Sequence, residues 1–183
     1  MQKKELTVDY KTNNKDENNT QENKKEKTAQ APFFPLFVSL AGKPVVIIGA
    51  GSIALRRVKT LLHFQARLKV IAPEIHAEIQ SLAQEHGFML EQRPYQTGDC
   101  TGAILAVAAT DDRSVNQKVA EECALAQIPV SVADNQAACT FFFPAIVKRD
   151  NLVIGVTSSG ENHGRVKRVA AKLRQEIEMI DTE

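Results

Sequence analysis

The chain has 183 residues, of which 43% are hydrophobic and 25% are charged, and its formal net charge is +1. A nearly neutral chain lacks the basic surface that follows a phosphate backbone, which argues against nucleic-acid binding as its main function. The sequence holds no apolar run of about 18 residues or more, so we expect no membrane-spanning helix. The length suits one domain with some additional chain.

The polar and charged residues are concentrated at the start of the chain. Residues 1–30 carry seven lysines and six acids with few apolar side chains. Such a segment cannot bury enough apolar surface to offset the entropy lost on ordering, so we predict a disordered tail over 1–30. The remaining chain, 31–183, has 16 basic and 16 acidic residues and enough apolar residues for a sizeable core.

The cysteines and histidines give no sign of a metal site. Cys100, Cys123 and Cys139 are odd in number and widely spaced, which favours neither a disulfide framework nor a zinc cluster. No two of the four histidines share a helix face, so we expect no metal bound by the protein. The lysines near the N-terminus precede no apolar stretch, so they form no secretory signal, and we expect a reducing, cytoplasmic location.

Strands and helices alternate through residues 31–137. The run 44–48 is continuous and β-branched, which is typical of a strand buried on both faces of a parallel sheet. A helical stripe of Ile53, Ala54, Val58, Leu61 and Leu62 follows it. The same pattern then predicts the strands 68–71, 89–92, 103–108 and 129–132, and the helices 75–85 and 114–126, the last capped by Ser114. We therefore predict an α/β fold with a Rossmann-like doubly wound parallel sheet.

The pattern changes in the segment 138–183. Two apolar runs, 140–147 and 152–157, flank the polar turn 148–151, which predicts a β-hairpin and not another parallel unit. A final helix is expected over about 164–179. We predict that 138–183 forms a short C-terminal segment outside the Rossmann-like domain.

A glycine-rich turn follows the first strand. Gly49, Gly51 and Ala54 form a GxGxxA pattern at the start of a helix. Gly49 permits a tight turn, Gly51 lets a pyrophosphate approach the backbone, and Ala54 allows the helix to pack closely on the sheet. The N–H groups and the dipole at the helix start favour an anion, so we predict a dinucleotide site.

Two further segments lie where such a cofactor would bind. Glu74, which follows Pro73, stands 20 residues after Ala54, at the distance expected for an acid that binds the ribose hydroxyls. The absence of an arginine directly after it favours NAD over NADP. Thr110 ends a strand at the same edge and is a candidate for the cofactor crevice. The neighbouring Asp111 and Asp112 have a second interpretation, as residues that end the strand and precede the helix.

Asp134 is the candidate acid or base. It follows the strand 129–132, and a partly desolvated carboxylate beside a crevice suits proton transfer, although a turn-forming aspartate is the alternative. The turn around Ser158 offers hydroxyl and amide groups for a ligand, or simply caps the last helix. His163 lies next to that turn and could face a ligand. A basic surplus in this third of the chain indicates either a solvated face or a site for a polycarboxylate: Lys148, Arg149, Arg165, Lys167 and Arg168.

The order of these motifs resembles a known family. The chain resembles the precorrin-2 dehydrogenase family, the NAD-dependent dehydrogenase domain of siroheme synthases. The resemblance covers about 33–178 and rests on the segments 34–37, 42–51, 70–74, 108–112, 132–134, 142–147 and 158–160, together with Leu40, Ala54, Arg57 and Asn116.

The resemblance implies a reaction and a set of residue roles. The reaction would be oxidation of precorrin-2, a tetrapyrrole polycarboxylate, to sirohydrochlorin with NAD as the oxidant. Asp134 matches the family's proposed general base, and Ser158 matches a serine in the substrate region. The cofactor positions correspond to Ser52, Ile53, Pro73 and Glu74. The substrate's carboxylates would suit the basic residues near Arg149 and Arg165, and the family's assembly implies a homodimer.

Two other functions stay open. The turn Ser158–His163 departs from the glycine-rich turn usual in the family, and this favours a non-catalytic module that binds NAD or a tetrapyrrole. In a metal chelatase for sirohydrochlorin, Asp134 and His163 would instead take up pyrrole protons. NADH formation distinguishes the dehydrogenase from both.

Overall fold

The computed structural model of the chain describes residues 33–159 and 161–180. The predicted disordered tail, 1–30, lies outside these residues. The described residues belong to one compact unit, and the boundary that we predict between 137 and 138 remains a prediction. Within the described residues, no helix is both long and apolar enough to cross a membrane.

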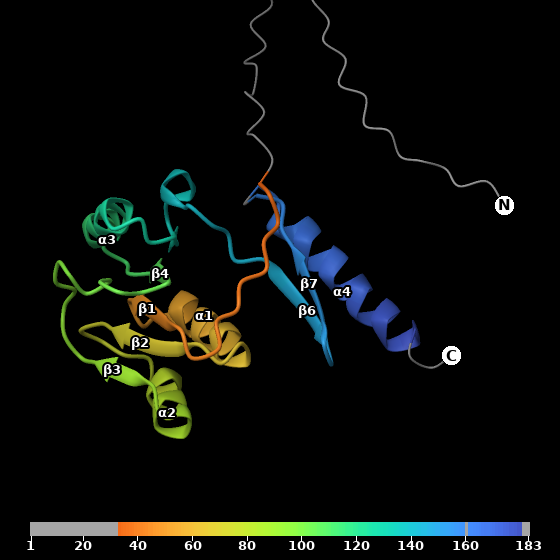
Figure 1. Cartoon of the computed structure of the whole chain (residues 1–183), viewed down its shortest axis with the longest axis horizontal. Coiled ribbons are helices and arrows are strands. Elements are labelled where there is room, and N and C mark those ends of the chain that lie inside the picture. Colours follow the sequence, from red (N-terminus) through yellow and green to blue (C-terminus); the bar gives the residue numbers. More distant parts are fainter. Residues whose placement is uncertain (1–32, 160, 181–183) are drawn as a thin grey trace, which may run out of the picture. The chain divides into compact units, whose positions relative to one another are not determined.

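Five parallel strands form one sheet in the order β3-β2-β1-β4-β5 (Figure 1). The elements are β1 (Pro44–Ile48), α1 (Ser52–His63), β2 (Arg67–Ile71), α2 (Ala77–His86), β3 (Met89–Glu91), β4 (Leu105–Ala108), α3 (Arg113–Leu125), β5 (Val130–Val132), the short 3-10 helix η1 (Gln136–Ala138), β6 (Ala145–Arg149), β7 (Leu152–Val156) and α4 (His163–Ile180). The strand order reverses at β1, between β2 and β4, and this confirms the predicted Rossmann-like sheet.

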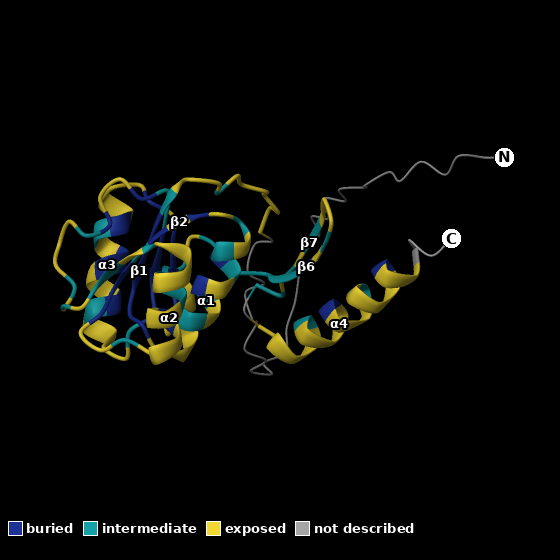
Figure 2. Ribbon diagram, turned by 90° about the horizontal axis from the view of Figure 1, so that it is seen from below, coloured by how far each residue is buried: buried dark blue, intermediate teal, exposed yellow. Residues whose placement is uncertain are grey.

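The core has two layers, one on each face of the sheet. Because side chains alternate along a strand, Val45 and Ile47 of β1 pack with α1 and α2, whereas Val46 and Ile48 pack with α3. All four are almost fully buried. Figure 2 shows the strands of the sheet dark blue between helices whose outer faces are yellow. Burial on both faces explains why β1 has no polar residue.

Local details of the helices differ from the sequence prediction. In α1 the residues Ala54, Val58 and Leu61 are buried, whereas Ile53 is exposed at the first turn. The cap of α3 is Asp112 and not Ser114, because the Asp112 carboxylate accepts the backbone N–H of Ser114 at 2.8 Å. Hydrogen bonding to Ser114 also lowers the pKa of Asp112. A carboxylate is one of the groups that suit this position, and its charge is favourable at the positive end of a helix.

The antiparallel hairpin β6–β7 and the helix α4 form a second small core. The register pairs Ala145 with Val156 and Arg149 with Leu152, so β6 extends into the predicted turn and only residues 150–151 make the bend. Val147 packs against Ala170 and Ile177 of α4. The predicted hairpin and final helix are therefore confirmed.

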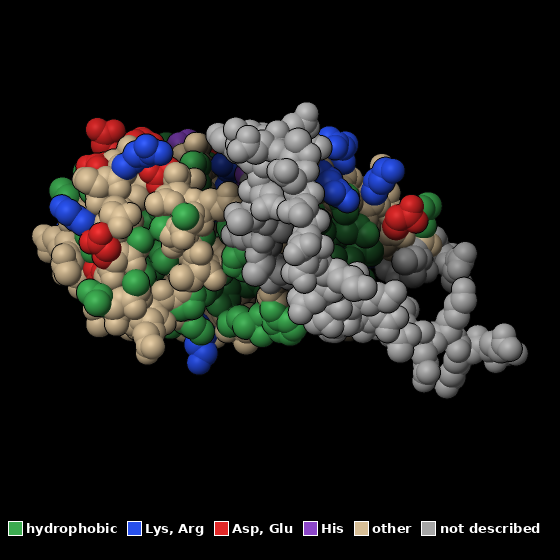
Figure 3. Space-filling model, turned by 90° about the horizontal axis from the view of Figure 1, so that it is seen from above, with side chains coloured by type: hydrophobic (Ala, Val, Ile, Leu, Met, Phe, Trp, Pro, Cys, Tyr) green, Lys and Arg blue, Asp and Glu red, His purple; other side chains and the backbone are tan. Residues whose placement is uncertain are grey.

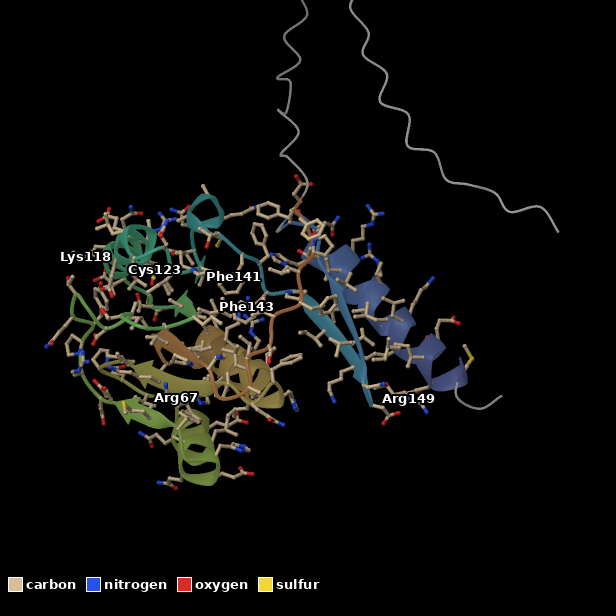
Figure 4. All side chains as sticks on the ribbon, viewed as in Figure 1. Arg67, Lys118, Cys123, Phe141, Phe143 and Arg149 are labelled. Atoms are coloured by element: carbon tan, nitrogen blue, oxygen red, sulfur yellow. The ribbon has the colours of Figure 1, made fainter. Side chains whose placement is uncertain are left out.

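Residues 139–144 connect the hairpin to the sheet. The Thr140 hydroxyl accepts the backbone N–H of Val130 at 2.8 Å, and the Arg57 guanidinium of α1 lies 4.2 Å from the centre of the Phe143 ring. Burial lowers the pKa of Arg57. Phe143 and Phe141 lie in this connection between β5 and β6 (Figure 4). The connection that leads into the hairpin is thus attached to both α1 and β5.

Two carboxylates hold the long connection between β3 and β4. Asp99, whose side chain is 8% exposed, accepts two hydrogen bonds from Arg93, at 2.6 and 2.8 Å. Glu122 of α3 accepts the Tyr95 hydroxyl and the backbone N–H of Cys100. Burial, together with Glu122, raises the pKa of Tyr95. The connection is therefore fixed to the body of the domain through charged hydrogen bonds.

We predict that the folded chain loses stability in acid through protonation of Asp99. Hydrogen bonding to Arg93 lowers the pKa of Asp99 in the folded state, so the folded chain binds fewer protons here than the unfolded one. This contribution is complete above the unfolded pKa of about 3.9 and is lost as the pH falls through the folded value. We expect Asp99→Asn to lower the urea midpoint at neutral pH and to reduce its decline in acid.

The matched control is Asp150→Asn, at the exposed hairpin turn, which should follow the wild type at every pH. An acid decline of the same size in Asp99→Asn and in the wild type would contradict the assignment to Asp99.

Candidate active site

Gly49 stands where the carboxyl ends of three strands meet. Its N–H donates to the Ile71 carbonyl at 2.8 Å, and the Ala109 N–H donates to the Ile48 carbonyl at the same distance. Its φ is +105°, and a Cβ at Gly49 would collide with the backbone carbonyl of Ala109. A side chain is therefore excluded here by the neighbouring strand end. Gly49 is needed by the fold itself.

Gly51 differs, because a Cβ there would meet no atom within 4 Å. Gly51 is the N-cap of α1, and no side chain caps this helix. Ser52 and Ile53 are exposed, while Ala54 is completely buried against the sheet. Open space over uncapped helical N–H groups fits a pyrophosphate, which would accept those hydrogen bonds close to the backbone.

The loop after β2 joins the glycine turn. The backbone N–H of His76 donates to the Ala50 carbonyl at 3.1 Å, and the Gln92 side chain donates to the Pro73 carbonyl at 3.3 Å. Pro73 and Glu74 are both exposed, and the Glu74 carboxylate has no hydrogen bond or ion pair among the described residues. The structure therefore brings Glu74 to the same edge of the sheet as the glycine turn, with its carboxylate accessible to a ligand.

A buried amide connects Thr110 with Asp134. The Asn116 Oδ1 accepts the Thr110 N–H at 3.1 Å and its hydroxyl at 2.9 Å, and Nδ2 donates to the Thr110 carbonyl at 2.9 Å. The same Nδ2 donates to Oδ1 of Asp134 at 2.9 Å. Asn116 is 1% exposed, so its four bonds are shielded from water. The end of β4 and the end of β5 are held together by this one side chain.

Asn116 is a site residue that was not predicted from the sequence, although a signal for it was present. Asn116 lies on the apolar stripe of α3, with Val119, Ala120 and Cys123 at helical spacing. A polar residue in a buried stripe needs hydrogen-bond partners, and those lie at the strand ends.

Asp134 borders an open pocket of about 370 Å³. Its side chain is 30% exposed, and its second oxygen, Oδ2, accepts a hydrogen bond from the Arg113 Nε at 3.3 Å. The pocket is lined by Arg113, Asn116, Gln117, Val132, Asp134 and Asn135. The carboxylate is thus fixed on one oxygen and accessible near the other, as proton transfer requires.

The turn after β7 approaches the Asp134 side of the sheet. The Gln136 side chain, two residues after Asp134, donates to the Ser159 carbonyl. The Ser158 hydroxyl accepts the Asn162 N–H at 2.9 Å, and the Asn162 side chain in turn accepts the Arg165 N–H at 2.8 Å. The turn therefore both caps α4 and lies beside the segment that carries Asp134.

His163 and Arg165 are exposed in the first turn of α4. The first two thirds of this helix are strongly basic, with Arg165, Lys167, Arg168, Lys172 and Arg174. On the face drawn in Figure 3, the right-hand part shows more Lys and Arg than acidic side chains, whereas the left-hand part mixes both charges. The start of α4 can thus attract an anion.

The structure does not bring Arg149 to the other substrate residues. Arg149 ends β6 beside the hairpin bend, whereas Ser158 follows the opposite end of β7. Its Nη1 donates to the Ile177 carbonyl at 2.8 Å, near the end of α4 (Figure 4). A guanidinium stabilises the carbonyl end of a helix, which gives Arg149 a structural task.

No group of three or more histidine, cysteine, aspartate or glutamate side chains that could hold a metal occurs among residues 33–159 and 161–180.

The sheet with its glycine turn defines a dinucleotide-binding domain of the Rossmann type. The family model described as "Putative NAD(P)-binding" matches residues 36–145, and the chain belongs to this family.

Curated relatives and a solved structure agree with the family. The chain is 43% identical over 141 residues to a siroheme synthase of Pseudomonas aeruginosa (strain LESB58), covering 77% of this chain and 30% of the relative. It is 41% identical over 143 residues to a "Probable multifunctional siroheme biosynthesis protein HemA" of Ruminiclostridium josui, covering 78% of this chain and 28% of the relative. The chain thus spans less than a third of the length of these two relatives.

The structure is similar to that of "SirC, precorrin-2 dehydrogenase". The TM-score is 0.66 and the sequence identity is 25%, and the match covers 79% of this chain and 71% of the other.

Substitutions of Gly49 and Gly51 are expected to have different effects, the first on stability and the second on NAD binding. We expect Gly49→Ala to lower the free energy of unfolding by about 3 kcal/mol, because the new Cβ collides with the Ala109 carbonyl at a positive φ. Gly51→Ala should cost less than about 1 kcal/mol, yet weaken NAD binding about tenfold, because its Cβ occupies the space above the helix start.

Urea unfolding and calorimetric titration with NAD⁺ measure both effects. Unchanged NAD affinity in a folded Gly51→Ala variant would place the pyrophosphate elsewhere.

Proposed function

We propose that the chain catalyses the NAD-dependent oxidation of precorrin-2 to sirohydrochlorin. The observation that carries this proposal is the Asp134 carboxylate, fixed by Asn116 at the carboxyl edge of a dinucleotide-binding sheet. The similarity to siroheme synthases and to a precorrin-2 dehydrogenase supports the choice of substrate.

The cofactor side of the site is assigned to exposed groups that the fold leaves available. The N–H groups at Ser52 and Ile53 would bind the pyrophosphate above Gly51, and Glu74 would accept hydrogen bonds from ribose hydroxyls. Thr110 is tied to Asn116 and forms the wall of the crevice at the end of β4. When bound, NAD⁺ supplies a two-electron acceptor.

The substrate side of the site is assigned to Asp134 and the turn near it. Asp134 removes a proton from the substrate through Oδ2, while the Asn116 bond to Oδ1 keeps the carboxylate oriented. Ser158, His163 and Arg165 are proposed to contact the substrate, and the basic start of α4 would attract its carboxylates. Arg149 is left out of this set because it lies at the other end of the hairpin.

Assembly and location are part of the proposal. We place the protein in the cytoplasm as a homodimer, with 31–137 as the cofactor domain and 138–183 as the segment for substrate and dimer contacts. Leu36 and Phe37 are exposed by 76% and 72%, which supports a further protein contact in the assembled state.

Anaerobic incubation with precorrin-2 and NAD⁺ tests the reaction, with NADH and the tetrapyrrole spectrum followed together. We expect both products to rise in step, and Asp134→Asn to lower kcat by about 100-fold or more, because the amide cannot take the proton. NAD affinity should be unchanged, since Asp134 is assigned to the substrate.

Asp111→Asn is the matched control, because Asp111 is an exposed acid at the same sheet edge that makes no side-chain hydrogen bond or ion pair among the described residues, and it should keep full turnover. Full turnover in Asp134→Asn would remove Asp134 from the mechanism. Binding of both ligands by the wild type without NADH would instead identify a non-catalytic NAD- and tetrapyrrole-binding module.

A further inference from the structure

Arg113 is a pocket residue that the proposed reaction leaves without a task. It is the first residue of α3, its side chain is 86% exposed, and it lines the pocket beside Asp134. Its Nε makes one hydrogen bond to Asp134, at 3.3 Å, and its two Nη nitrogens have no partner among the described residues. Most of the hydrogen-bonding capacity of the guanidinium is therefore unused and open to solvent at the edge of the pocket.

The stability of the fold does not explain this placement. A cation in the first turn of a helix is disfavoured by the helix dipole, and the first turn of α3 holds no acid after the Asp112 cap. A single long ion pair from an exposed arginine contributes little free energy. Asp134 is already oriented by Asn116, whose amide is buried and fully bonded.

We propose that Arg113 binds a carboxylate substituent of the substrate next to the reacting carbon, and so selects acidic tetrapyrroles. This inference rests on the proposed function and deepens it. A guanidinium matches a carboxylate with two parallel hydrogen bonds, and both Nη groups are available for that pairing. A neutral substituent would gain only weaker hydrogen bonds without ion pairing, so the pocket favours carboxylates over neutral groups.

Binding of a substrate carboxylate by Arg113 would also free an oxygen of Asp134 to act as the base. Without substrate, Arg113 and the Asp134 Oδ2 are paired. When a substrate carboxylate takes over the guanidinium, Oδ2 loses this donor and can accept the substrate proton, while Asn116 still holds Oδ1. Binding of the correct anion and release of the base are therefore coupled through one side chain.

The test compares Arg113→Gln, Arg113→Lys and the matched control Lys118→Gln. Lys118 lies on the same helix (Figure 4) and carries the same charge, but it does not line the pocket. The measurements are kcat, the KM for precorrin-2 and for NAD⁺, and the Kd of sirohydrochlorin from spectral titration at low and high salt. Arg113 is exposed, so its variants should fold, and urea unfolding checks this.

We expect Arg113→Gln to raise the KM for precorrin-2 and the Kd of sirohydrochlorin about tenfold at low salt, as for a lost charged hydrogen bond. The kcat of Arg113→Gln and its KM for NAD⁺ should stay within about twofold of the wild-type values. The KM for precorrin-2 and the Kd of sirohydrochlorin in Arg113→Lys should lie between those of the wild type and of Arg113→Gln. Lysine keeps the charge but cannot form the two parallel hydrogen bonds. Lys118→Gln should match the wild type.

Two results would overturn the inference. A lower kcat and a shifted pH profile with unchanged KM would mean that Arg113 acts on Asp134 alone. A weaker NAD⁺ interaction with unchanged tetrapyrrole affinity would assign the guanidinium to a cofactor phosphate.

The titration separates this inference from the proposed function. If the wild type binds sirohydrochlorin in an Arg113-dependent way but forms no NADH, the anion site stands and the dehydrogenase reaction fails. If turnover occurs and Arg113→Gln has unchanged KM and Kd, the inference alone fails.

Discussion

The side chain of Asn116 joins the ends of β4 and β5 and lines the pocket beside Asp134. An amide offers two acceptor positions and two donors, and here each has a partner within hydrogen-bonding distance, three on Thr110 and one on Asp134. Asn116 is only 1% exposed, so the loss of any one of these hydrogen bonds would leave a buried polar group without a partner. The network also fixes the orientation of the amide, because the Thr110 N–H must face an oxygen and a carboxylate must face the NH₂ group.

This constraint explains why the site lies where the strand order reverses. The glycine turn after β1 touches the end of β4 through Gly49 and Ala109, and the end of β4 is tied to β5 through Asn116. The cofactor half and the base half of the site therefore share one rigid strand end. A shift of β4 would move both halves together, so the distance between them is protected by the core beneath them.

The periodicity of the sequence was sufficient to predict the parallel sheet, the hairpin and the last helix. These elements are recognisable because local patterns decide them: β1 has no polar residue, and α1 has a clear stripe. The cap of α3 was misplaced, since Ser114 and Asp112 are both good caps and only backbone geometry decides between them. The edge positions of Glu74, Thr110 and Asp134 followed from strand ends alone. The hydrogen-bond partners of Arg149 and Asn116 could not be predicted from local patterns, because they lie 28 and 18 residues away in the sequence. For Asn116, its place on the apolar stripe of α3 indicated only that it would be buried.

The charge order along α4 is opposite to the one its dipole favours. Its basic residues begin at the positive end, whereas Glu176 and Glu178 lie near the negative end. The helix is therefore held in place by its packing on the hairpin, against its own electrostatics. An anion bound at its start relieves this conflict, so ligand binding and the folding of the C-terminal segment are thermodynamically linked. The last helix would then fray most readily when the site is empty and tighten as a polyanion arrives.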